Sequence, residues 1–224
     1  MKKPVVDYRG FRLSKINQPE YAHLKWLVGW LVYFLFYFLT ENLIPVEKCH
    51  LIHSPLDDLI PFNEYFFIPY TFWYLLIVIS LGYFALYNVE NFVNLQKYII
   101  ITQVVAMTVY ILYPSYQDLR PTEFTRDNFF TWVASIIYTA DTPTGVCPSL
   151  HVAYSLGIGS CWLKEKSARW PWKSFVVFSV VLISLSTAVV KQHSVLDIFA
   201  ALPLGLLAEY LVFHKYWKAK WKKQ

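Results

Sequence analysis

Charged residues are scarce in this sequence. Asp, Glu, Lys and Arg make up 16% of its 224 residues, whereas 56% are hydrophobic. The apolar residues form blocks of about twenty residues between short polar segments, which is typical of membrane proteins and excludes an ordinary soluble domain. Trp and Tyr gather at the ends of these blocks, where an interfacial aromatic belt is expected. The belt includes Trp26, Trp30, Tyr70, Trp73, Trp170, Trp172, Trp217 and Trp221.

Cysteine is rare as well. The three cysteines, Cys49, Cys147 and Cys161, do not have the spacing of a metal site. Cys161 falls inside an apolar block, so at most one disulfide is expected, between Cys49 and Cys147.

The sequence also lacks an independent basic domain, a recognisable cleavable signal peptide and internal repeats. The net charge is +5, but the basic residues flank apolar blocks and form no independent basic domain. Orientation in a bilayer therefore explains them better than nucleic-acid binding. No cleavable signal peptide is expected, because the first fifteen residues are polar and the first apolar block is long and lacks a small-residue cleavage site. Without internal repeats or low-complexity linkers, residues 1–224 are expected to form a single membrane domain.

The apolar blocks predict an all-α protein, a bundle of six transmembrane helices with short loops. The fourth block is short for a span of about twenty residues, so it either begins before His151 or is partly buried against its neighbours. Residues Asn128–Ala140 have apolar residues at helical spacing and predict an amphipathic helix on the outer surface. The six expected spans are Trp26–Ile44, Tyr65–Tyr87, Tyr98–Tyr113, His151–Leu163, Trp172–Val190 and Ser194–Phe213.

The distribution of Lys and Arg predicts the orientation. With a cytoplasmic N-terminus, 16 of the 20 Lys and Arg residues fall on the inner side, which is a strong positive-inside signal. Both termini are therefore expected in the cytoplasm. The C-terminal lysines from Lys215 to Lys223 are interpreted as an anchor that touches anionic headgroups. The four basic residues left outside are Lys48, Arg120, Arg126 and Lys191.

Three short stretches with chemically active residues are all expected on the outer side. They are Arg120-Pro121, Cys147-Pro148-Ser149-Leu150-His151 and the stretch from Lys191 to Asp197. Arg126, Asp127, Glu123 and Asp141 lie in the same outer loop and are interpreted as solvated surface residues. The histidines outside these stretches are interpreted as interfacial.

The residue types suit phosphoryl transfer. His193 and Asp197 are four residues apart, so on a helix they would share a face, and the carboxylate would orient the imidazole for nucleophilic attack. Pro148-Ser149 is a good helix start, whose backbone N–H groups and hydroxyl would bind an anion.

The remaining groups would complete such a site. His151 would protonate a leaving alkoxide. Arg120 and Lys191 would donate hydrogen bonds to the phosphoryl oxygens.

These stretches resemble the three signature motifs of the type 2 phosphatidic acid phosphatase superfamily, K-x-x-x-x-x-x-R-P, P-S-G-H and S-R-x-x-x-x-x-H-x-x-x-D. The resemblance covers residues 113–197. It implies a phosphohistidine intermediate at His193, orientation by Asp197, and protonation of the leaving group by His151. It also implies phosphate binding by Arg120 and Ser149, and neither a metal nor another cofactor.

Three positions depart from these motifs. The motif lysine is replaced by Tyr113, the glycine by Leu150 in the phosphate-binding stretch, and the arginine by Thr187. Lys191 lies four residues after Thr187 and would replace the lost charge if this stretch is helical. The substitutions resemble the branch that contains inositol phosphorylceramide synthases and sphingomyelin synthases, which transfer a lipid phosphoryl group to another alcohol.

The sequence thus predicts a lipid phosphate phosphatase in the bilayer, expected in a bacterial plasma membrane with an extracytoplasmic site. Its expected partners are a lipid phosphate substrate and an alcohol acceptor, with no nucleic acid. One alternative is a lipid phosphotransferase, and another is a non-catalytic lipid transporter or assembly partner with a degenerate site. A vanadate-dependent haloperoxidase reaction is less favoured, because such relatives are soluble. The sequence leaves the lipid, the oligomeric state and the choice between hydrolysis and transfer open.

Overall fold

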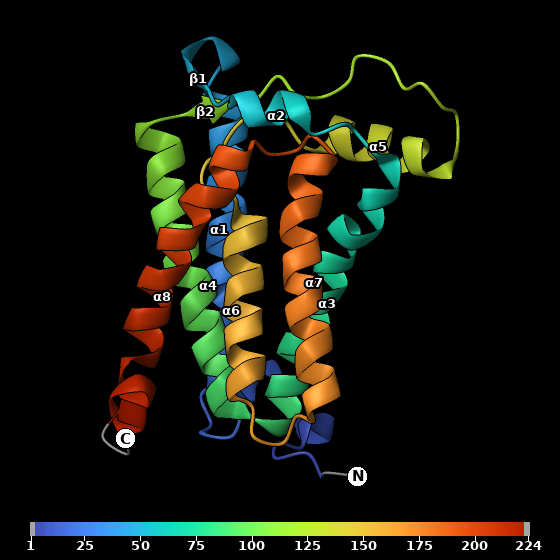
Figure 1. Ribbon diagram of the computed structural model, residues 1–224. Helices are drawn as coiled ribbons and strands as arrows, with labels where there is room; N and C mark the ends of the chain where they lie inside the picture. The colour runs from blue at the N-terminus through green and yellow to red at the C-terminus, as the bar shows by residue number, and fades with distance from the viewer. Residues whose placement is uncertain (1–2, 222–224) are drawn as a thin grey trace.

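The computed structural model describes residues 3–221, and this part of the chain is almost entirely helical (Figure 1). Two short strands, β1 (His50–Leu51) and β2 (Ser115–Tyr116), pair in parallel. The N-terminal segment that precedes the first long helix contains three short 3-10 turns, Tyr8–Gly10, Leu13–Lys15 and Ala22–Leu27. The α-helices are α1 (Val28–Leu43), α2 (Pro55–Leu59), α3 (Phe67–Tyr87), α4 (Val89–Leu112), α5 (Phe129–Ala140), α6 (Leu150–Lys164), α7 (Trp170–Val189) and α8 (Val195–Trp221).

Five helical segments are long and apolar enough to cross a membrane. They are Ala22–Leu43, Glu64–Tyr87, Val89–Leu112, Trp170–Val189 and Val195–Lys220. In a bilayer such helices satisfy their own backbone hydrogen bonds, so long apolar blocks adopt this structure. The predicted all-helical class is confirmed in the described residues, but the predicted count of six spans is not.

The predicted number of spans exceeds the number of long apolar helices by one because α6 is short. This helix has 15 residues, which gives about 22 Å at about 1.5 Å per residue, against about 30 Å for the hydrocarbon core. It begins at Leu150, one residue before the predicted start, and most of its side chains are buried. The prediction that the fourth block starts earlier or is partly buried is therefore confirmed on both points. Figure 1 shows that α6 begins below the upper ends of α7 and α8, so its first residues are recessed within the bundle.

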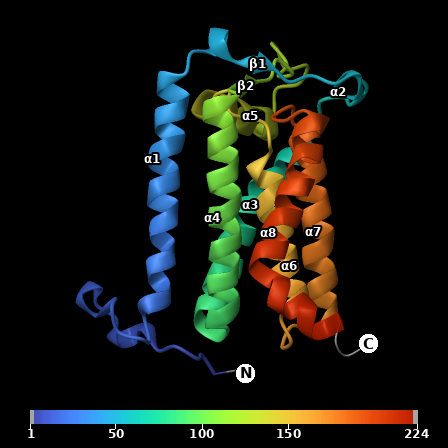
Figure 2. The same ribbon diagram turned by 90° about the vertical axis from the view of Figure 1, so that its left-hand side faces the viewer.

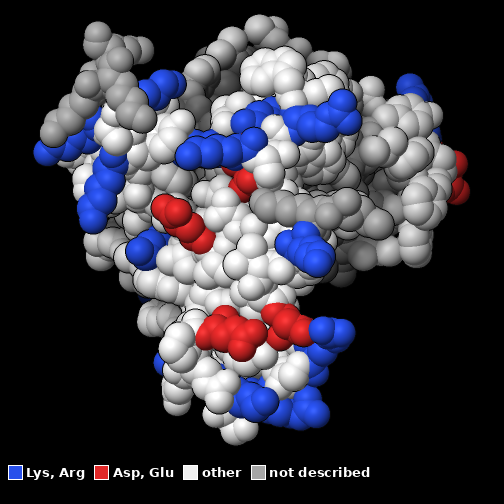
Figure 3. Space-filling view, turned by 90° about the horizontal axis from the view of Figure 1, so that it is seen from below, with Lys and Arg blue, Asp and Glu red and all other residues white. Residues whose placement is uncertain are grey.

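The long helices run between two distinct ends of the bundle. The N-terminal segment, the α6–α7 loop and the end of α8 lie at the lower end in Figures 1 and 2, whereas α2, α5 and the α7–α8 loop lie at the upper end. Seen from below, the lower end shows many Lys and Arg side chains (Figure 3). The two ends of the described chain therefore share one end of the bundle, as the predicted topology requires.

The helix α5 confirms the predicted element at Asn128–Ala140. Asn128 caps it, because its side chain accepts hydrogen bonds from Phe130 N and Thr131 N. Thr131 and Ala134 are buried, whereas Phe129 and Trp132 are exposed at the upper end. All three cysteines are free, so the one disulfide that the sequence left open, between Cys49 and Cys147, is not formed in the structure.

The centre of the bundle depends on a glycine in α6. A Cβ at Gly157 would lie 2.5 Å from Cδ1 of Tyr98. The ring cannot withdraw easily, because the Tyr98 hydroxyl donates to the carbonyl of Gly205 in α8 over 2.8 Å. The pairing of α4, α6 and α8 thus requires the absence of a side chain at position 157.

Gly157→Ala is expected to destabilise the protein by about 1–3 kcal/mol through overpacking, seen as a lower apparent melting temperature in detergent. Gly82→Ala is the matched control, because a Cβ at Gly82 meets no atom within 4 Å. The control is expected to hold or raise the melting temperature, since alanine favours helix. Equal melting temperatures for the two variants would contradict this account of the packing.

Candidate active site

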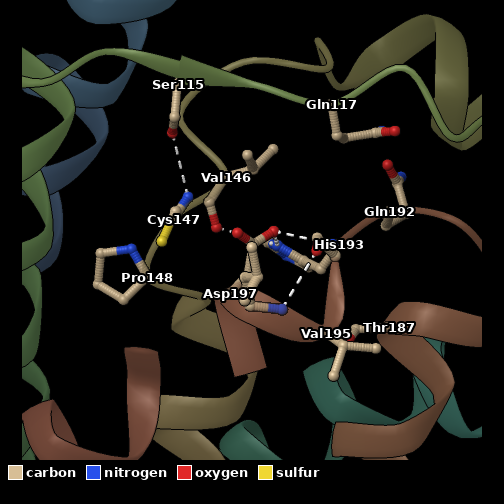
Figure 4. A network of polar contacts seen from close by, with 12 residues as sticks. Ser115, Gln117, Val146, Cys147, Pro148, Thr187, Gln192, His193, Val195 and Asp197 are labelled. Carbon is tan, nitrogen blue, oxygen red and sulfur yellow. Dashed lines mark hydrogen bonds and ion pairs between the residues drawn. The ribbon is translucent and has the colours of Figure 1, made fainter. Parts of the chain in front are cut away.

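Residues from two of the predicted stretches meet at the upper end of the bundle. The His193 ring lies in the α7–α8 loop, and the His151 ring lies in the first turn of α6, with 5.6 Å between their centroids. The Asp197 carboxylate approaches His193 from the first turn of α8 (Figure 4). The predicted convergence of the two imidazoles and the acid is therefore found in the geometry.

The hydrogen bonds of His193 fix its tautomer. Its Nδ1 lies 3.0 Å from the carbonyl oxygen of Val146 and 3.1 Å from Oδ2 of Asp197. Both partners are acceptors when the carboxyl is ionised, so Nδ1 carries the proton and donates to both. The other nitrogen, Nε2, is then left with its lone pair. Because His193 lines a cavity, this arrangement would suit a nucleophile.

The His193–Asp197 contact does not arise as the sequence predicted. His193 is not on a helix, because α7 ends at Val189 and α8 begins at Val195. Instead, Asp197 Oδ2 also accepts from Ser194 N over 3.0 Å, so the carboxylate closes the first turn of α8. The carboxylate thereby fixes both the helix start and the imidazole two residues before it. The predicted hydrogen bond is confirmed, and the shared helix face is wrong.

The start of α6 holds the second predicted stretch. Ser149 is its N-cap, as predicted, and its backbone N–H donates to the carbonyl of Asp197 over 3.1 Å. The hydroxyl of Tyr110 in α4 donates to the carbonyl of Pro148 over 2.7 Å, and this bond holds the segment that leads into α6. The hydroxyl of Ser149 is fully buried and has no hydrogen-bond partner in the described chain. Leu150 lines the cavity as the first residue of α6.

The ring of His151 rests on aromatic residues of α3. Its centroid lies 4.6 Å from that of Tyr70 and 4.1 Å from that of Trp73. Its Nε2 is buried and has no hydrogen-bond partner among the described residues. The sequence analysis placed Tyr70 and Trp73 in an interfacial belt, but both are buried against the site. No motif in the sequence marks this supporting role.

Arg120 does not present its guanidinium as a free phosphate ligand. Nη1 donates to the carbonyls of Tyr138 and Asp141, and Nη2 donates to the carbonyl of Thr142. Nη2 also donates to Oε1 of Gln192, at 2.5 Å. The predicted direct role is thus replaced by bracing of the α5–α6 loop, and Arg120 reaches the site through Gln192. Burial lowers the pKa of Arg120, which the Asp141 carboxylate opposes.

Lys191 points away from the cavity. Its ammonium donates to the carbonyl of Asp57 over 2.7 Å, and the residue is buried. Its φ of 56° ends the helical path after α7, so it does not share a helix face with Thr187 as expected. The predicted phosphate contact of Lys191 is therefore corrected to a contact with α2. Burial lowers the pKa of this ammonium, and the carboxylates of Asp57 and Asp58 oppose the shift.

Asp57 in α2 is the residue that the sequence analysis missed. It is buried, and its carboxylate accepts from Ser194 Oγ at 2.6 Å, Val195 N at 2.8 Å and Ser54 N at 2.8 Å. Two of these donors are the residues that directly follow His193. Asp57 therefore fixes the start of α8 and the end of the loop that carries His193. The capping-box spacing of Ser54 and Asp57 marks α2 in the sequence, but nothing there indicates the contact with α8.

Two glutamines near His193 were also missed. Gln117 and Gln192 are buried, and both are drawn above His193 in the view of Figure 4. Their Nε2 atoms have no hydrogen-bond partner in the described residues, and the same holds for Nε of Arg120. Buried donors of this kind normally have partners. Gln192 also lines the cavity beside His193, so its unpartnered amide N–H is placed to meet an anion there.

A cavity of about 590 Å³ lies in front of the two histidines. Its far walls are aromatic and aliphatic side chains of α1 and α3. Phe34 of α1 and Val78 of α3 line it and are 56% and 67% exposed, so it opens between these helices on the side of the bundle. Such an opening would face lipid if the helices cross a bilayer.

Asp141 is not the solvated residue that was expected. It lines the cavity, and its Oδ1 accepts from the Tyr37 hydroxyl over 2.6 Å. Glu123, Arg126 and Asp127 are exposed as expected, and Arg126 also forms an ion pair with Glu64 at 3.2 Å. The cavity thus carries a carboxylate on one wall.

The motif positions that depart from the family pattern provide no cation at the cavity. Tyr113 stacks on His50 with 4.1 Å between the ring centroids and is half exposed. Thr187 is buried, and its hydroxyl donates to the carbonyl of Ser184 over 2.8 Å. Residues 3–221 contain no group of three or more His, Cys, Asp or Glu that could hold a metal ion.

Comparisons with family models, curated proteins and solved structures found no match to this chain.

Proposed function

We propose that this protein is a membrane enzyme that cleaves a lipid phosphate ester through a phosphohistidine at His193. The observation that supports this most directly is the pair of acceptors on Nδ1 of His193, a carbonyl and a carboxylate. They leave Nε2 unprotonated beside a cavity, within reach of a second imidazole. This is the arrangement that nucleophilic catalysis requires.

The reaction has two steps. In the first, the Nε2 lone pair of His193 attacks phosphorus, the bond from phosphorus to the ester oxygen breaks, and the leaving alkoxide takes a proton from His151. The phosphorylated ring is cationic, because Nδ1 keeps its proton, and Asp197 stabilises that charge. In the second step, water or an alcohol attacks phosphorus, gives its proton to His151, and the P–N bond breaks.

Hydrogen-bond donors around His193 would stabilise the charge that develops on the phosphoryl oxygens. The unpartnered donors are Nε2 of Gln192, which lines the cavity, Nε2 of Gln117 and the hydroxyl of Ser149. Gln192 is held in place before the substrate arrives, since its Oε1 accepts from Arg120, which is itself fixed by three carbonyls. Preorganised donors of this kind supply the largest share of catalysis in many enzymes.

The cavity supports a lipid as the substrate. Its wall is mostly apolar, and its opening lies on the side of the bundle between α1 and α3 rather than at the upper end alone. In this proposal α6 is a sixth, shortened membrane helix shielded from lipid by its neighbours. The lower, basic end faces the cytoplasm and the site faces the outer leaflet, in a bacterial plasma membrane.

Transfer to an alcohol is the second candidate, and the charges favour it over simple hydrolysis. A lipid phosphomonoester carries up to two negative charges, whereas a phosphodiester carries one. The ammonium of Lys191 is turned toward α2, most donors of Arg120 bind carbonyls, and the Asp141 carboxylate lines the cavity. A site with few free cations suits a singly charged diester.

The test is a two-product assay on the purified full-length protein in detergent. A lipid phosphomonoester and a lipid phosphodiester are each supplied with and without a long-chain alcohol. With the phosphomonoester, free phosphate indicates hydrolysis, and a phosphomonoester of the added alcohol indicates transfer. With the phosphodiester, release of a phosphomonoester indicates hydrolysis, and a new phosphodiester of the added alcohol indicates transfer. If neither product forms and no phosphate is trapped on His193, the protein is a non-catalytic lipid-binding protein and the proposal fails.

A further inference from the structure

A second groove lies at the lower end of the bundle, far from the histidines. It has a volume of about 490 Å³ and lies between the 3-10 segment Ala22–Leu27, α4 and the end of α8. The reaction proposed above does not use it. Its lining residues are Trp26, Glu90, Asn94, Lys97, Ile100, Ile101, Leu211, Val212, Phe213, His214, Lys215 and Tyr216.

The charged residues of this groove are mostly basic and unpaired. Neither Lys97 nor Lys215 forms an ion pair with a carboxylate in residues 3–221. The Lys97 ammonium lies 5.3 Å from the ring centroid of Trp26, which holds it at the groove without neutralising it. Glu90 is the one acidic residue in the lining. The groove therefore has a net positive charge.

An ion pair at the same end of the bundle does not offset this charge. Lys164 of α6 binds Glu209 of α8 at 2.6 Å, and both side chains are largely buried. Glu209 also accepts from Ser160 and from Trp217. That carboxylate is fully engaged and does not compensate Lys97 or Lys215.

The groove is amphiphilic along the helix axes. Trp26 and Tyr216 line the groove together with its basic residues, and these residue types favour the headgroup region of a bilayer. The aliphatic part is formed by Ile100 and Ile101 of α4 and by Leu211 and Val212 of α8. Ile100 and Ile101 lie one turn above Lys97 in α4, and Leu211 lies one turn above Lys215 in α8, so apolar contacts extend from the basic residues into the bundle.

We propose that this groove binds an anionic phospholipid of the leaflet at the lower end. The lipid phosphate contacts Lys97 and Lys215, and one acyl chain lies along the aliphatic part between α4 and α8. Basic grooves between membrane helices suit such headgroups. The bound lipid joins the N-terminal segment to α4 and α8, and binding to the folded state raises its stability.

The experiment measures lipid binding by the delipidated full-length protein in a neutral detergent. Dioctanoyl phosphatidylglycerol and dioctanoyl phosphatidylcholine are titrated separately, and inorganic phosphate is titrated in a third arm. Native mass spectrometry counts bound molecules, and the apparent melting temperature reports stabilisation. We expect saturable binding and a rise in melting temperature with the anionic lipid alone.

Two variants test the assignment of the groove. Lys97→Gln/Lys215→Gln is expected to weaken binding of the anionic lipid about tenfold or more, whereas Glu90→Gln is expected to strengthen it. The matched control is Lys166→Gln/Lys218→Gln, which removes the same charge from exposed positions outside the groove. Both double variants are compared with the wild type by melting temperature before lipid is added.

Three results would overturn the proposal. Equal weakening by the two double variants would show attraction to the whole basic end rather than binding in the groove. Equal binding of the zwitterionic lipid would show that charge plays no part, and inorganic phosphate binding as tightly as the lipid would exclude a role for the acyl chain. None of these outcomes depends on catalysis, so the lipid site and the proposed function are tested independently.

Discussion

Replacing His193 with Ala is expected to abolish formation of the phosphoenzyme and to lower turnover at least about a thousandfold. No other described group can take its place, because the only other imidazole at the cavity, His151, lies against Tyr70 and Trp73. The measurement is the rate of product formation with radiolabelled lipid, together with acid-labile, base-stable label on the protein.

The roles of the two histidines can be distinguished by comparing substrates with different leaving groups in His151→Ala. With an alkyl leaving group the first step needs the proton from His151, so both steps become slow. With a nitrophenyl leaving group the first step needs no acid, and the phosphoenzyme is expected to accumulate because the second step lacks its base. A burst of nitrophenol equal to the enzyme concentration, followed by slow turnover, is the expected result.

The matched control is His50→Ala at the same end of the bundle. His50 stacks on Tyr113 and does not line the cavity, so turnover is expected to stay near the wild-type level. The nucleophile assignment fails if His193→Ala still forms a phosphoenzyme, or if His50→Ala is as inactive as His193→Ala.

Replacing Asp57 with Asn is expected to lower kcat about a hundredfold, with little change in KM. The carboxylate accepts from three donors, and two of them belong to Ser194 and Val195. An amide cannot accept all three, since its NH₂ group would face donors. The loop after His193 would then shift, and a displacement of about 1 Å is enough to cost about a hundredfold in rate. Because Asp57 does not line the cavity, binding of the substrate should change little.

The control for this prediction is Asp58→Asn, the adjacent carboxylate in α2. The Asp58 side chain is 65% exposed and pairs with His53 instead of the loop. It is expected to keep the wild-type kcat. The role assigned to Asp57 would be refuted by a normal rate of phosphoenzyme formation in Asp57→Asn, or by an activity loss that merely follows the folded fraction measured by melting.

Parts of the fold were predictable because the constraint on them is strong and local. A chain in a bilayer must satisfy its own backbone hydrogen bonds, so long apolar blocks marked α1, α3, α4, α7 and α8. The block at α6 was correctly predicted to be short, since burial among protein neighbours removes the need to match the bilayer. The His193–Asp197 contact was also predictable, because the two residues are only four positions apart.

The contacts of long, flexible side chains, and contacts between residues far apart in the sequence, were not predictable in the same way. Arg120 and Lys191 have flexible side chains that choose among acceptors brought near by the fold, and both are engaged by backbone carbonyls. Asp57 lies 137 positions before Ser194 in the sequence. No local pattern records so distant a contact.

The sequence by itself determined that this is a helical protein with membrane-spanning segments, and it placed two histidines and an acid on one side of them. Hydropathy and short spacing contain that information, because both act over one helix or one turn. The tertiary structure alone decided which groups surround His193 and which cations are withdrawn from it. Those outcomes depend on how separate helices pack, and packing is a property of the whole chain.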